Sequence, residues 1–387
     1  MRFGLWLTRQ FNSQQTNGIR FHPIQRNQGS YPMKHARIAA VVASLFALPT
    51  MSFAADNVTV YGIAQAAVSS VDNGSVRQTI IEDTGSRIGF KGEEDLGAGL
   101  AAFFKIESAV ALDDASKSGF ATREGWVGLK NKDWGLVKLG RGKSYFDLAQ
   151  ESFDGFNGNS TMINSLLIDN AYYRISNSIA YESPDMGGLV AKVEYGDIEK
   201  KGSTAGTGKK HNPYTLIGVL EYNNGPIYAV AGVESQRDQA TGQAGSSIKS
   251  VADDAKATNT LLGGGFTFDS GTNVKLAWRH SKWKAGTGAT TQKRNAFIGV
   301  VTQPITPVAS VRLGFTKVAD IKNTSDTGGT YWAIGGDYAL SKRTIAYTEF
   351  TRAGNDKNAG GLLQTSAGQA AGERNNNAWT TGLIHLF

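Results

Sequence analysis

An unusual segment of the sequence, residues 141–170, carries three carboxylic acids within a stretch of eight residues. They are Asp147, Glu151 and Asp154. The segment separates two strand-like stretches but shows neither strand alternation nor a sustained helical pattern. It contains too many apolar residues for a solvated linker, and an ordered connector of this length usually has a function. Two interpretations remain open at this point. The segment is either a surface loop that covers a sheet edge or a loop folded inward that narrows a pore.

Motifs for catalysis are absent from the sequence. The pattern GRGKS (140–144) ends like a phosphate-binding loop, but the position that needs glycine is Val137. His211, His280 and His385 lie far apart, and without cysteine or a His-x-x-x-His pair there is no zinc-binding pattern. A Gly-x-Ser-x-Gly nucleophile motif is also missing. We therefore expect no enzyme activity, no cofactor and no structural metal ion.

Two pairs of adjacent acids, Asp113-Asp114 and Asp253-Asp254, lie in long polar connectors. Solvation by water is the simplest interpretation of both pairs. Weak binding of a divalent cation is the alternative, because carboxylate oxygens are the ligands that such hard cations prefer.

The N-terminal residues carry the pattern of an export signal. The apolar run IAAVVASLFAL (38–48) follows Lys34 and Arg37 and precedes Ser-Phe-Ala at 52–54. A positive region, a short apolar region and a cleavage site of small residues define a secretory signal peptide. The sequence therefore predicts three parts: an upstream extension of the reading frame (1–32), a signal peptide (33–54) and a mature chain that forms the folded protein (55–387).

Charge and hydropathy exclude two other classes of protein. The 387 residues include 40 basic and 33 acidic side chains, a formal net charge of +7. Residues 1–54 hold six of the basic groups and no acid, so the mature chain is close to neutral, at +1. The basic character is therefore poor evidence for nucleic-acid binding. No uncharged apolar run approaches the length of a transmembrane helix.

Strand-like alternation dominates the mature sequence. In LAAFFKIESA (100–109), one face carries Leu100, Ala102, Phe104 and Ile106, while Lys105 and Glu107 lie on the other; NVKLAWRHS (273–281) places Lys275 and Arg279 opposite Val274, Leu276 and Trp278 in the same way. A period of two with one apolar face is the pattern of a half-buried strand. Sixteen such strands are predicted: 57–70, 85–94, 98–111, 120–131, 135–142, 171–183, 188–197, 213–223, 226–236, 259–269, 272–284, 292–303, 307–319, 329–339, 343–353 and 375–387.

The connectors between these strands alternate in length. Short ones carry turn residues, as at 184–187 and 340–342, whereas long ones such as 71–84, 237–258 and 354–374 are polar and rich in glycine. Strict alternation places all short turns at one end and all long loops at the other. Outer-membrane barrels have this layout, together with an even number of strands.

A soluble β-sandwich or lectin-like protein is the alternative fold. The predicted strand length suits a tilted strand that crosses a membrane, and no helical run offers a second layer. The C-terminal segment AWTTGLIHLF (378–387) adds a separate indication, because Trp379, Leu383 and His385 share one face and the chain ends on Phe387. A terminal aromatic residue on an amphipathic last strand suits barrel closure and delivery to the assembly machinery.

At this point the chain resembles a general diffusion porin of the Gram-negative outer membrane, most closely the β-proteobacterial type. The resemblance implies a sixteen-stranded antiparallel transmembrane β-barrel, usually a homotrimer, whose long third loop folds into the lumen. It also implies basic residues on the barrel wall that face acids on that loop. The motifs that carry the resemblance span the mature chain: VTVYG (58–62), SRIGFKGEEDLGAGLAAFFKIE (86–107), TREGWVGLKNKDWGLVKLGR (122–141), YRISNSIAYESP (173–184), LSKRT (340–344) and the terminal HLF.

Matched residue by residue, the resemblance implies that Arg87, Arg123 and Arg174 line the pore constriction. Lys105 is added from its strand face and Arg141 from its position next to the loop. The opposing acids are those of the loop, although the Pro-Glu-Phe-Gly turn of many family members is replaced here by ESFDGF (151–156). The predicted constriction thus consists of eight residues: Arg87, Lys105, Arg123, Arg141, Arg174, Asp147, Glu151 and Asp154.

The leading functional hypothesis is an outer-membrane channel for passive diffusion of small hydrophilic solutes and ions, with a weak preference for anions. Its expected partners are further copies of the chain, outer-membrane lipid and lipopolysaccharide. A barrel that acts mainly as an adhesin or receptor, through loops such as 237–258 and 354–374, is the alternative. A substrate-selective channel is a third hypothesis, but it would usually show an aromatic ladder or extra inward loops, and the sequence indicates neither.

Overall fold

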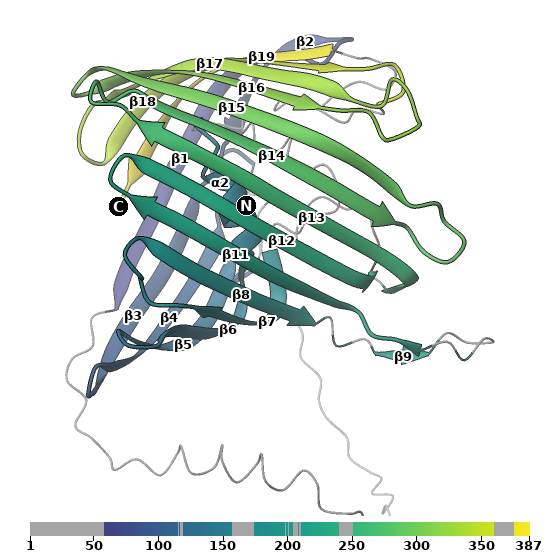
Figure 1. Ribbon diagram of the computed structural model, residues 1–387. Coiled ribbons are helices and arrows are strands. Elements are labelled where there is room, and N and C mark those ends of the chain that lie inside the picture. The colour runs from purple at the N-terminus through teal and green to yellow at the C-terminus, as the bar shows by residue number, and fades with distance from the viewer. Residues whose placement is uncertain are drawn as a thin grey trace, which may run out of the picture. The chain divides into compact units, whose positions relative to one another are not determined.

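The computed structural model describes residues 58–114, 116, 119–156, 174–197, 199, 201–203, 208, 210–239, 251–359 and 375–387. Most of them belong to long antiparallel strands that form one sheet, as Figure 1 shows. The strands are β1 (Thr59–Asp72), β2 (Arg77–Asp83), β3 (Arg87–Gly97), β4 (Leu100–Ala109), β5 (Glu124–Asn131), β6 (Gly135–Lys143), β7 (Arg174–Glu182), β8 (Leu189–Asp197), β11 (Tyr214–Asn224), β12 (Ile227–Gln239), β13 (Val251–Thr267), β14 (Asn273–Lys284), β15 (Gln292–Thr306), β16 (Ala309–Val318), β17 (Gly329–Ala339), β18 (Thr344–Asn355) and β19 (Asn375–Leu386). A separate two-stranded sheet joins β9 (Gly202–Ser203) and β10 (Lys210–His211).

Strands β2 and β3 together occupy a single position in the sheet. Both pair with β1: β2 with residues 66–72 and β3 with residues 59–63. At the interruption, Ser86 replaces the missing ladder bonds, because its Oγ accepts from the backbone N–H of Gln65 and donates to the Gln65 carbonyl. Counted this way, the 17-stranded sheet has sixteen wall positions, which confirms the predicted number and the all-β class.

The first and last strands of the described sheet, β1 and β19, close the barrel. Strand β1 pairs with β19 from Ile63↔Leu386 to Asp72↔Asn377. Beyond this ladder, the backbone N–H of Gly62 donates to the carbonyl of Phe387 at 2.9 Å, and the N–H of Phe387 donates back to Gly62 at 3.1 Å. The Phe387 ring lies where a side chain at position 62 would stand, since a Cβ there would be 2.2 Å from the ring. Closure leaves no sheet edge exposed.

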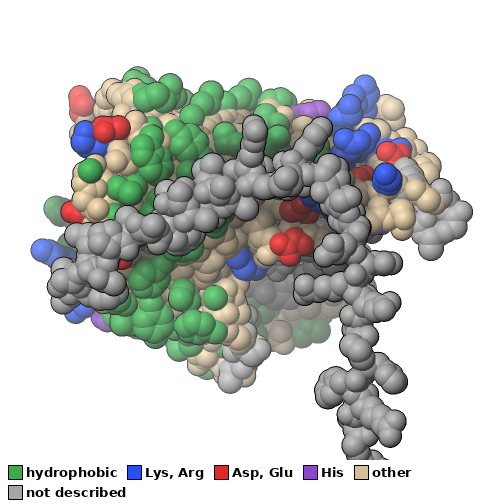
Figure 2. Space-filling model, turned by 90° about the horizontal axis from the view of Figure 1, so that it is seen from below, with side chains coloured by type: hydrophobic (Ala, Val, Ile, Leu, Met, Phe, Trp, Pro, Cys, Tyr) green, Lys and Arg blue, Asp and Glu red, His purple; other side chains and the backbone are tan. Residues whose placement is uncertain are grey.

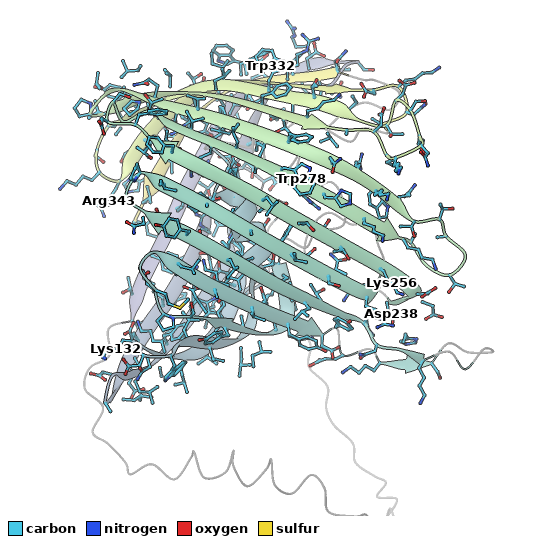
Figure 3. The ribbon with its side chains drawn as sticks, viewed as in Figure 1. Lys132, Asp238, Lys256, Trp278, Trp332 and Arg343 are labelled. Carbon is cyan, nitrogen blue, oxygen red and sulfur yellow. The ribbon has the colours of Figure 1, made fainter. Side chains whose placement is uncertain are left out.

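Short and long connectors lie at opposite ends of the barrel, as the sequence predicts. In Figure 3, Lys132 and Arg343 mark the end with the short turns, and Asp238 and Lys256 mark the end with the long loops. The prediction of a long connector at 71–84 is wrong. The chain turns within 73–76, where the N–H of Asn73 donates to the carbonyl of Val76, and β2 then extends the second wall position.

The outward face of the wall is apolar. Leu276 is 63% exposed, whereas the next residue, Ala277, is 7% exposed. The same alternation places the predicted apolar faces of β14 and β19 outside and Arg279 inside. Figure 2 shows the resulting apolar surface on the barrel wall. Its members include Val60, Val68, Ile81, Val127, Leu139, Val193, Leu216, Leu220, Leu262, Phe297, Leu313, Phe315, Ile334, Trp379 and Leu383.

A short helix, α2 (Tyr145–Glu151), interrupts the strand pattern after β6. Ser144 caps it, because its Oγ accepts the backbone N–H of Asp147 at 2.9 Å. The sequence shows no sustained helical pattern here, and the helix has only seven residues. Residues 157–173, the remainder of the predicted inward loop, lie outside the described residues. No described helix is long and apolar enough to cross a bilayer.

Candidate functional site

Glu107 of β4 is the centre of a charged group on the inward face of the wall. Arg123 donates its Nε–H to Glu107 Oε1 at 2.7 Å, and the hydroxyl of Tyr61 donates to Oε2 at 2.9 Å. Arg87 Nε lies 3.9 Å from Oε1, and Lys105 Nζ lies 3.7 Å from Oε2. The structure thus brings three of the eight predicted site residues together, around a carboxylate of the wall.

A second wall carboxylate extends this group. Glu124, the first residue of β5, lies 3.0 Å from Lys105 Nζ and accepts the indole N–H of Trp126 at 3.0 Å. The side chains of Glu107 and Glu124 are 5% and 15% exposed. Each is held by cations or hydrogen-bond donors, so both acids partly neutralise the basic residues around them.

Arg141 and Arg174 lie on the neighbouring strands β6 and β7. Arg141 donates from Nη1 to Ser176 Oγ at 2.6 Å and from Nε to the carbonyl of Thr122 at 3.3 Å. Lys143 is paired with Arg174 in the strand register. Its amine also lies within the electrostatic reach of Arg87 and Arg123. We refer to these six residues as the cationic cluster: Arg87, Lys105, Arg123, Arg141, Lys143 and Arg174.

Two of the predicted loop acids face the cationic cluster from α2. Glu151 forms an ion pair with Lys143. Asp147 is fully buried, and Lys143 and Arg174 are the attractive charges that act on it most strongly. Burial nevertheless raises the pKa of the Asp147 carboxyl above its ordinary value.

Asp154 lies beyond α2, and Lys143 is the member of the cationic cluster that acts on it. Its Oδ1 accepts the backbone N–H of Phe156 at 3.0 Å. Glu349 and Arg312, on β18 and β16, are the charged side chains that act on it most strongly. Burial raises the pKa of this carboxyl, and the nearby Glu349 adds to the increase.

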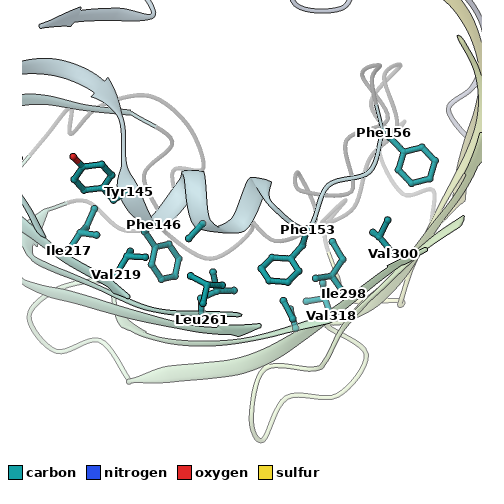
Figure 4. Packing of buried hydrophobic residues seen from close by; sticks show 14 of the residues in the cluster. Tyr145, Phe146, Phe153, Phe156, Ile217, Val219, Leu261, Ile298, Val300 and Val318 are labelled. Carbon is teal, nitrogen blue, oxygen red and sulfur yellow. The ribbon is translucent and has the colours of Figure 1, made fainter. Parts of the chain in front are cut away.

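Aromatic side chains attach α2 and the residues after it to the wall. We call residues 145–156 the α2 segment. Phe146 and Phe153 are 0% exposed. Phe153 packs over Gly263 of β13, where a Cβ would lie 2.2 Å from the ring, and Phe146 lies over Gly232 of β12. Figure 4 shows the segment along the concave side of the curved sheet, with Phe156 near Val300.

Polar contacts fix the same segment to β14. Arg279 is 2% exposed and donates from Nη1 to Gln150 Oε1 at 3.1 Å and from Nη2 to Asn259 Oδ1 at 2.8 Å. Lys275 donates to the carbonyl of Ser152 at 2.6 Å. Buried hydrogen bonds to charged groups are stronger than neutral ones. The segment therefore has both an apolar and a polar attachment to the wall.

The two acid pairs singled out in the sequence have protein partners. Asp113 accepts the backbone N–H of Asp83, and Asp114 accepts that of Ser116. Asp254 forms an ion pair with Lys284 at 2.8 Å. Within the described residues, no group of three or more potential ligands could hold a metal ion.

Three members of this site escaped the sequence analysis: Glu107, Glu124 and Lys143. Glu107 shares the predicted polar face with Lys105, which was the available signal. Its role depends on the register that places Gly89 of β3 opposite Glu107 and Glu107 opposite Glu124. The register between neighbouring strands cannot be derived from a single sequence.

The arrangement suits selection of solutes by charge. Among the described residues of this site, no nucleophile is paired with a base. The cations lie on the barrel wall, and the acids lie on the wall and on the attached α2 segment. A barrel of sixteen strands leaves a water-filled channel, whereas eight would be filled by side chains. Fold and site together define a pore-forming β-barrel of the outer membrane.

The comparisons agree with this class. The profile of the Gram-negative porin family matches residues 39–358, so the chain belongs to that family. The major outer membrane protein P.IA of Neisseria meningitidis serogroup C is 27% identical over 341 residues, which cover 80% of this chain and 84% of the relative. The major outer membrane protein P.IB of Neisseria lactamica is 26% identical over 370 residues, covering 92% of this chain and 100% of that protein.

A solved structure gives the same result. The anion-selective porin from Comamonas acidovorans superimposes with a TM-score of 0.72 and 26% identity, covering 86% of this chain and 100% of that one. This protein is therefore a porin of the Gram-negative outer membrane, a channel for passive diffusion.

Proposed function

We propose that solutes pass through a constriction between the α2 segment and the cationic cluster. The observation that carries this proposal is the attachment of Phe146 and Phe153 to β12 and β13, on the inward face of the wall. The cationic cluster lies on other strands, β3 to β7 with the residue before β5. The segment meets the cluster at Lys143, which pairs with Glu151. The proposed passage therefore runs between the segment and Arg87, Lys105 and Arg123, and the predicted inward loop narrows it.

The proposed selectivity is a weak preference for anions. The cationic cluster has six basic residues, against Glu107 and Glu124 on the wall and Asp147 and Glu151 on α2. The excess of positive charge favours anions at the narrowest point. Water in the lumen screens each charge, with a Debye length of about 8 Å at physiological salt. The preference should therefore decrease as the salt concentration rises.

The proposed assembly is a homotrimer in the outer membrane, in contact with lipid and lipopolysaccharide. The short turns would face the periplasm and the long loops the exterior, as in other barrels of this kind. No enzyme activity and no cofactor are proposed. Single-channel recording in a planar bilayer tests the function, because an adhesin or receptor barrel with a closed lumen would give no conductance steps.

The mature protein should begin near Ala55. The export signal in residues 33–54 is the reason, together with the start of β1 at Thr59, four residues later. N-terminal sequencing of protein from isolated outer membranes measures the start directly. Recovery of residues 1–32 on the membrane-inserted protein would contradict both the signal peptide and the upstream extension.

Anion preference should increase between pH 8 and pH 5. The pKa values of Asp147 and Asp154 are raised, so both carboxyls take up protons in a range where ordinary carboxyls, with pKa values near 4, stay ionised. The α2 segment then loses negative charge as the pH falls. Reversal potentials in a salt gradient at each pH measure the change. In the double variant Asp147→Asn/Asp154→Asn, only the other titratable groups should still change the reversal potential with pH. An unaltered pH dependence of the reversal potential would refute the role given to these two carboxyls.

A further inference from the structure

Aromatic and basic side chains form rows on the inward face of β4 to β6. The register places Phe103 opposite Gly128 and Gly128 opposite Lys138. Trp126 lies two residues before Gly128 and therefore shares its face of the sheet. Val127, between them, is 56% exposed on the apolar outside. The rings of Phe103 and Trp126 thus lie on the channel side.

The Phe103 ring extends across the neighbouring strand. A Cβ at Gly128 would lie 2.8 Å from Cζ of Phe103, so the glycine leaves the space that the ring occupies. Tyr61 lies over Gly89 of β3 in the same way, because a Cβ at Gly89 would lie 2.4 Å from Cζ of Tyr61. Phe103 and Trp126 are partly exposed, and their rings meet at 73° with centroids 5.2 Å apart. The two rings meet in an edge-to-face corner, and the amine of Lys130 lies 6.0 Å from the Phe103 centroid.

Lysine amines surround this corner, and they differ in their partners. Lys105 is paired with Glu124 at 3.0 Å, and Lys130 is paired with Glu93 at 2.5 Å. The amine of Lys138 lies 5.3 Å from the centroid of Trp126 and 4.8 Å from that of Tyr145 on α2. Within the described part of the chain, Lys138 forms no ion pair. The carboxylates of Glu124, Glu182 and Glu194 act on this amine without forming an ion pair with it, so a solute carboxylate can be its direct counter-ion.

We propose that Phe103, Trp126 and Lys138 form a binding subsite for small aromatic carboxylates. The solute ring packs against the rings of Phe103 and Trp126, and its carboxylate pairs with the Lys138 ammonium. Aromatic pairs prefer such tilted arrangements to face-to-face stacking. An aliphatic acid lacks the ring and an uncharged aromatic molecule lacks the carboxylate, so each meets only half of the subsite. The inference rests on the proposed constriction pathway, and it names a solute class for it.

The two rings of the subsite are not an aromatic ladder, so the expectation that the sequence indicates no such ladder stays as it was. The sequence analysis missed the subsite because Phe103 and Trp126 are far apart in the chain and neither belongs to a run of aromatic residues. They become neighbours only through the β4–β5 register.

Single-channel current in potassium chloride, with benzoate added, tests the subsite. Benzoate should reduce the current with saturation, at concentrations about tenfold lower than those at which acetate or benzyl alcohol acts. Phe103→Leu keeps an apolar side chain over Gly128 but removes the ring, and Lys138→Gln removes the charge. Each variant should raise the half-blocking concentration of benzoate about threefold or more, the range of one aromatic or ionic contact. Lys132→Gln, at an exposed turn, is the matched control and should change nothing.

The outcomes separate this inference from the proposed function. Conductance steps in potassium chloride with benzoate no better than acetate would overturn the subsite and leave the channel intact. Equal action of benzyl alcohol, with no effect of Lys138→Gln, would overturn it too, because the ring alone would then be recognised. Absence of any steps would contradict the proposed function and the subsite together.

Discussion

Replacement of Arg87, Arg123 and Arg174 by serine should move the reversal potential toward cations. The three guanidinium groups supply half of the cationic cluster, and Arg123 is the cation closest to Glu107. Without them, the cations left in the cluster are Lys105, Arg141 and Lys143, which Glu107, Glu124 and Glu151 offset, so the excess of positive charge in the cluster is lost. We expect the anion-to-cation permeability ratio to fall about threefold in dilute salt and less at 1 M, where the Debye length is about 3 Å.

A control of equal charge separates this local effect from the net charge of the protein. Arg77, Arg343 and Arg352 are exposed, and their triple replacement by serine removes the same three charges elsewhere. That variant should keep the original reversal potential. Glu107→Gln should shift the potential in the opposite direction, because Arg87 and Arg123 lose the carboxylate they share. If the first triple variant conducts with unaltered selectivity, these arginines do not line the narrowest point.

The strand faces and the closure of the barrel could be predicted because each depends on local information. Alternation with a period of two places Leu276 and Arg279 on opposite faces of their strand, whichever strands lie next to it. Phe387 follows β19, and its backbone bonds to Gly62 of β1 extend the closing ladder. The second wall position was harder, because Arg77, Gln78 and Thr79 in β2 are polar and resemble loop residues. Pairing with β1 stabilises this strand despite its composition.

The site was less predictable because it depends on contacts between distant strands. Glu107 meets Arg87 and Arg123 only through the β3–β4 and β4–β5 registers. Helix α2 is too short for a periodic pattern, although Ser144 followed by Asp147 is a typical capping sequence. The three predicted loop acids also differ in their surroundings, which their spacing in the sequence does not indicate. Glu151 pairs with Lys143, whereas burial governs the state of Asp147 and Asp154.

Removal of residues 150–162 should raise the single-channel conductance. The deleted stretch includes Gln150 and Phe153, two contacts that attach the α2 segment to Arg279 and Gly263. A chain shortened here no longer has the length or the anchors to remain on the inward face, so the passage widens. The sixteen wall strands are untouched, and the barrel should still fold. Unchanged conductance in a folded protein would place this segment outside the pathway of the solutes.

A milder variant should loosen the α2 segment without shortening the chain. Phe146→Ala/Phe153→Ala removes two fully buried rings, and each Phe→Ala change in a packed core costs about 3–5 kcal/mol. Because these rings pack over Gly232 and Gly263, their loss weakens the attachment of the segment, not the wall ladder. We expect larger current noise and closure at lower voltage, since a segment that moves in the passage alters its width. Phe297→Ala removes a ring that is 50% exposed on the outer face and should behave like the original protein. Equal noise in the two variants would show that Phe146 and Phe153 do not hold the constriction in place.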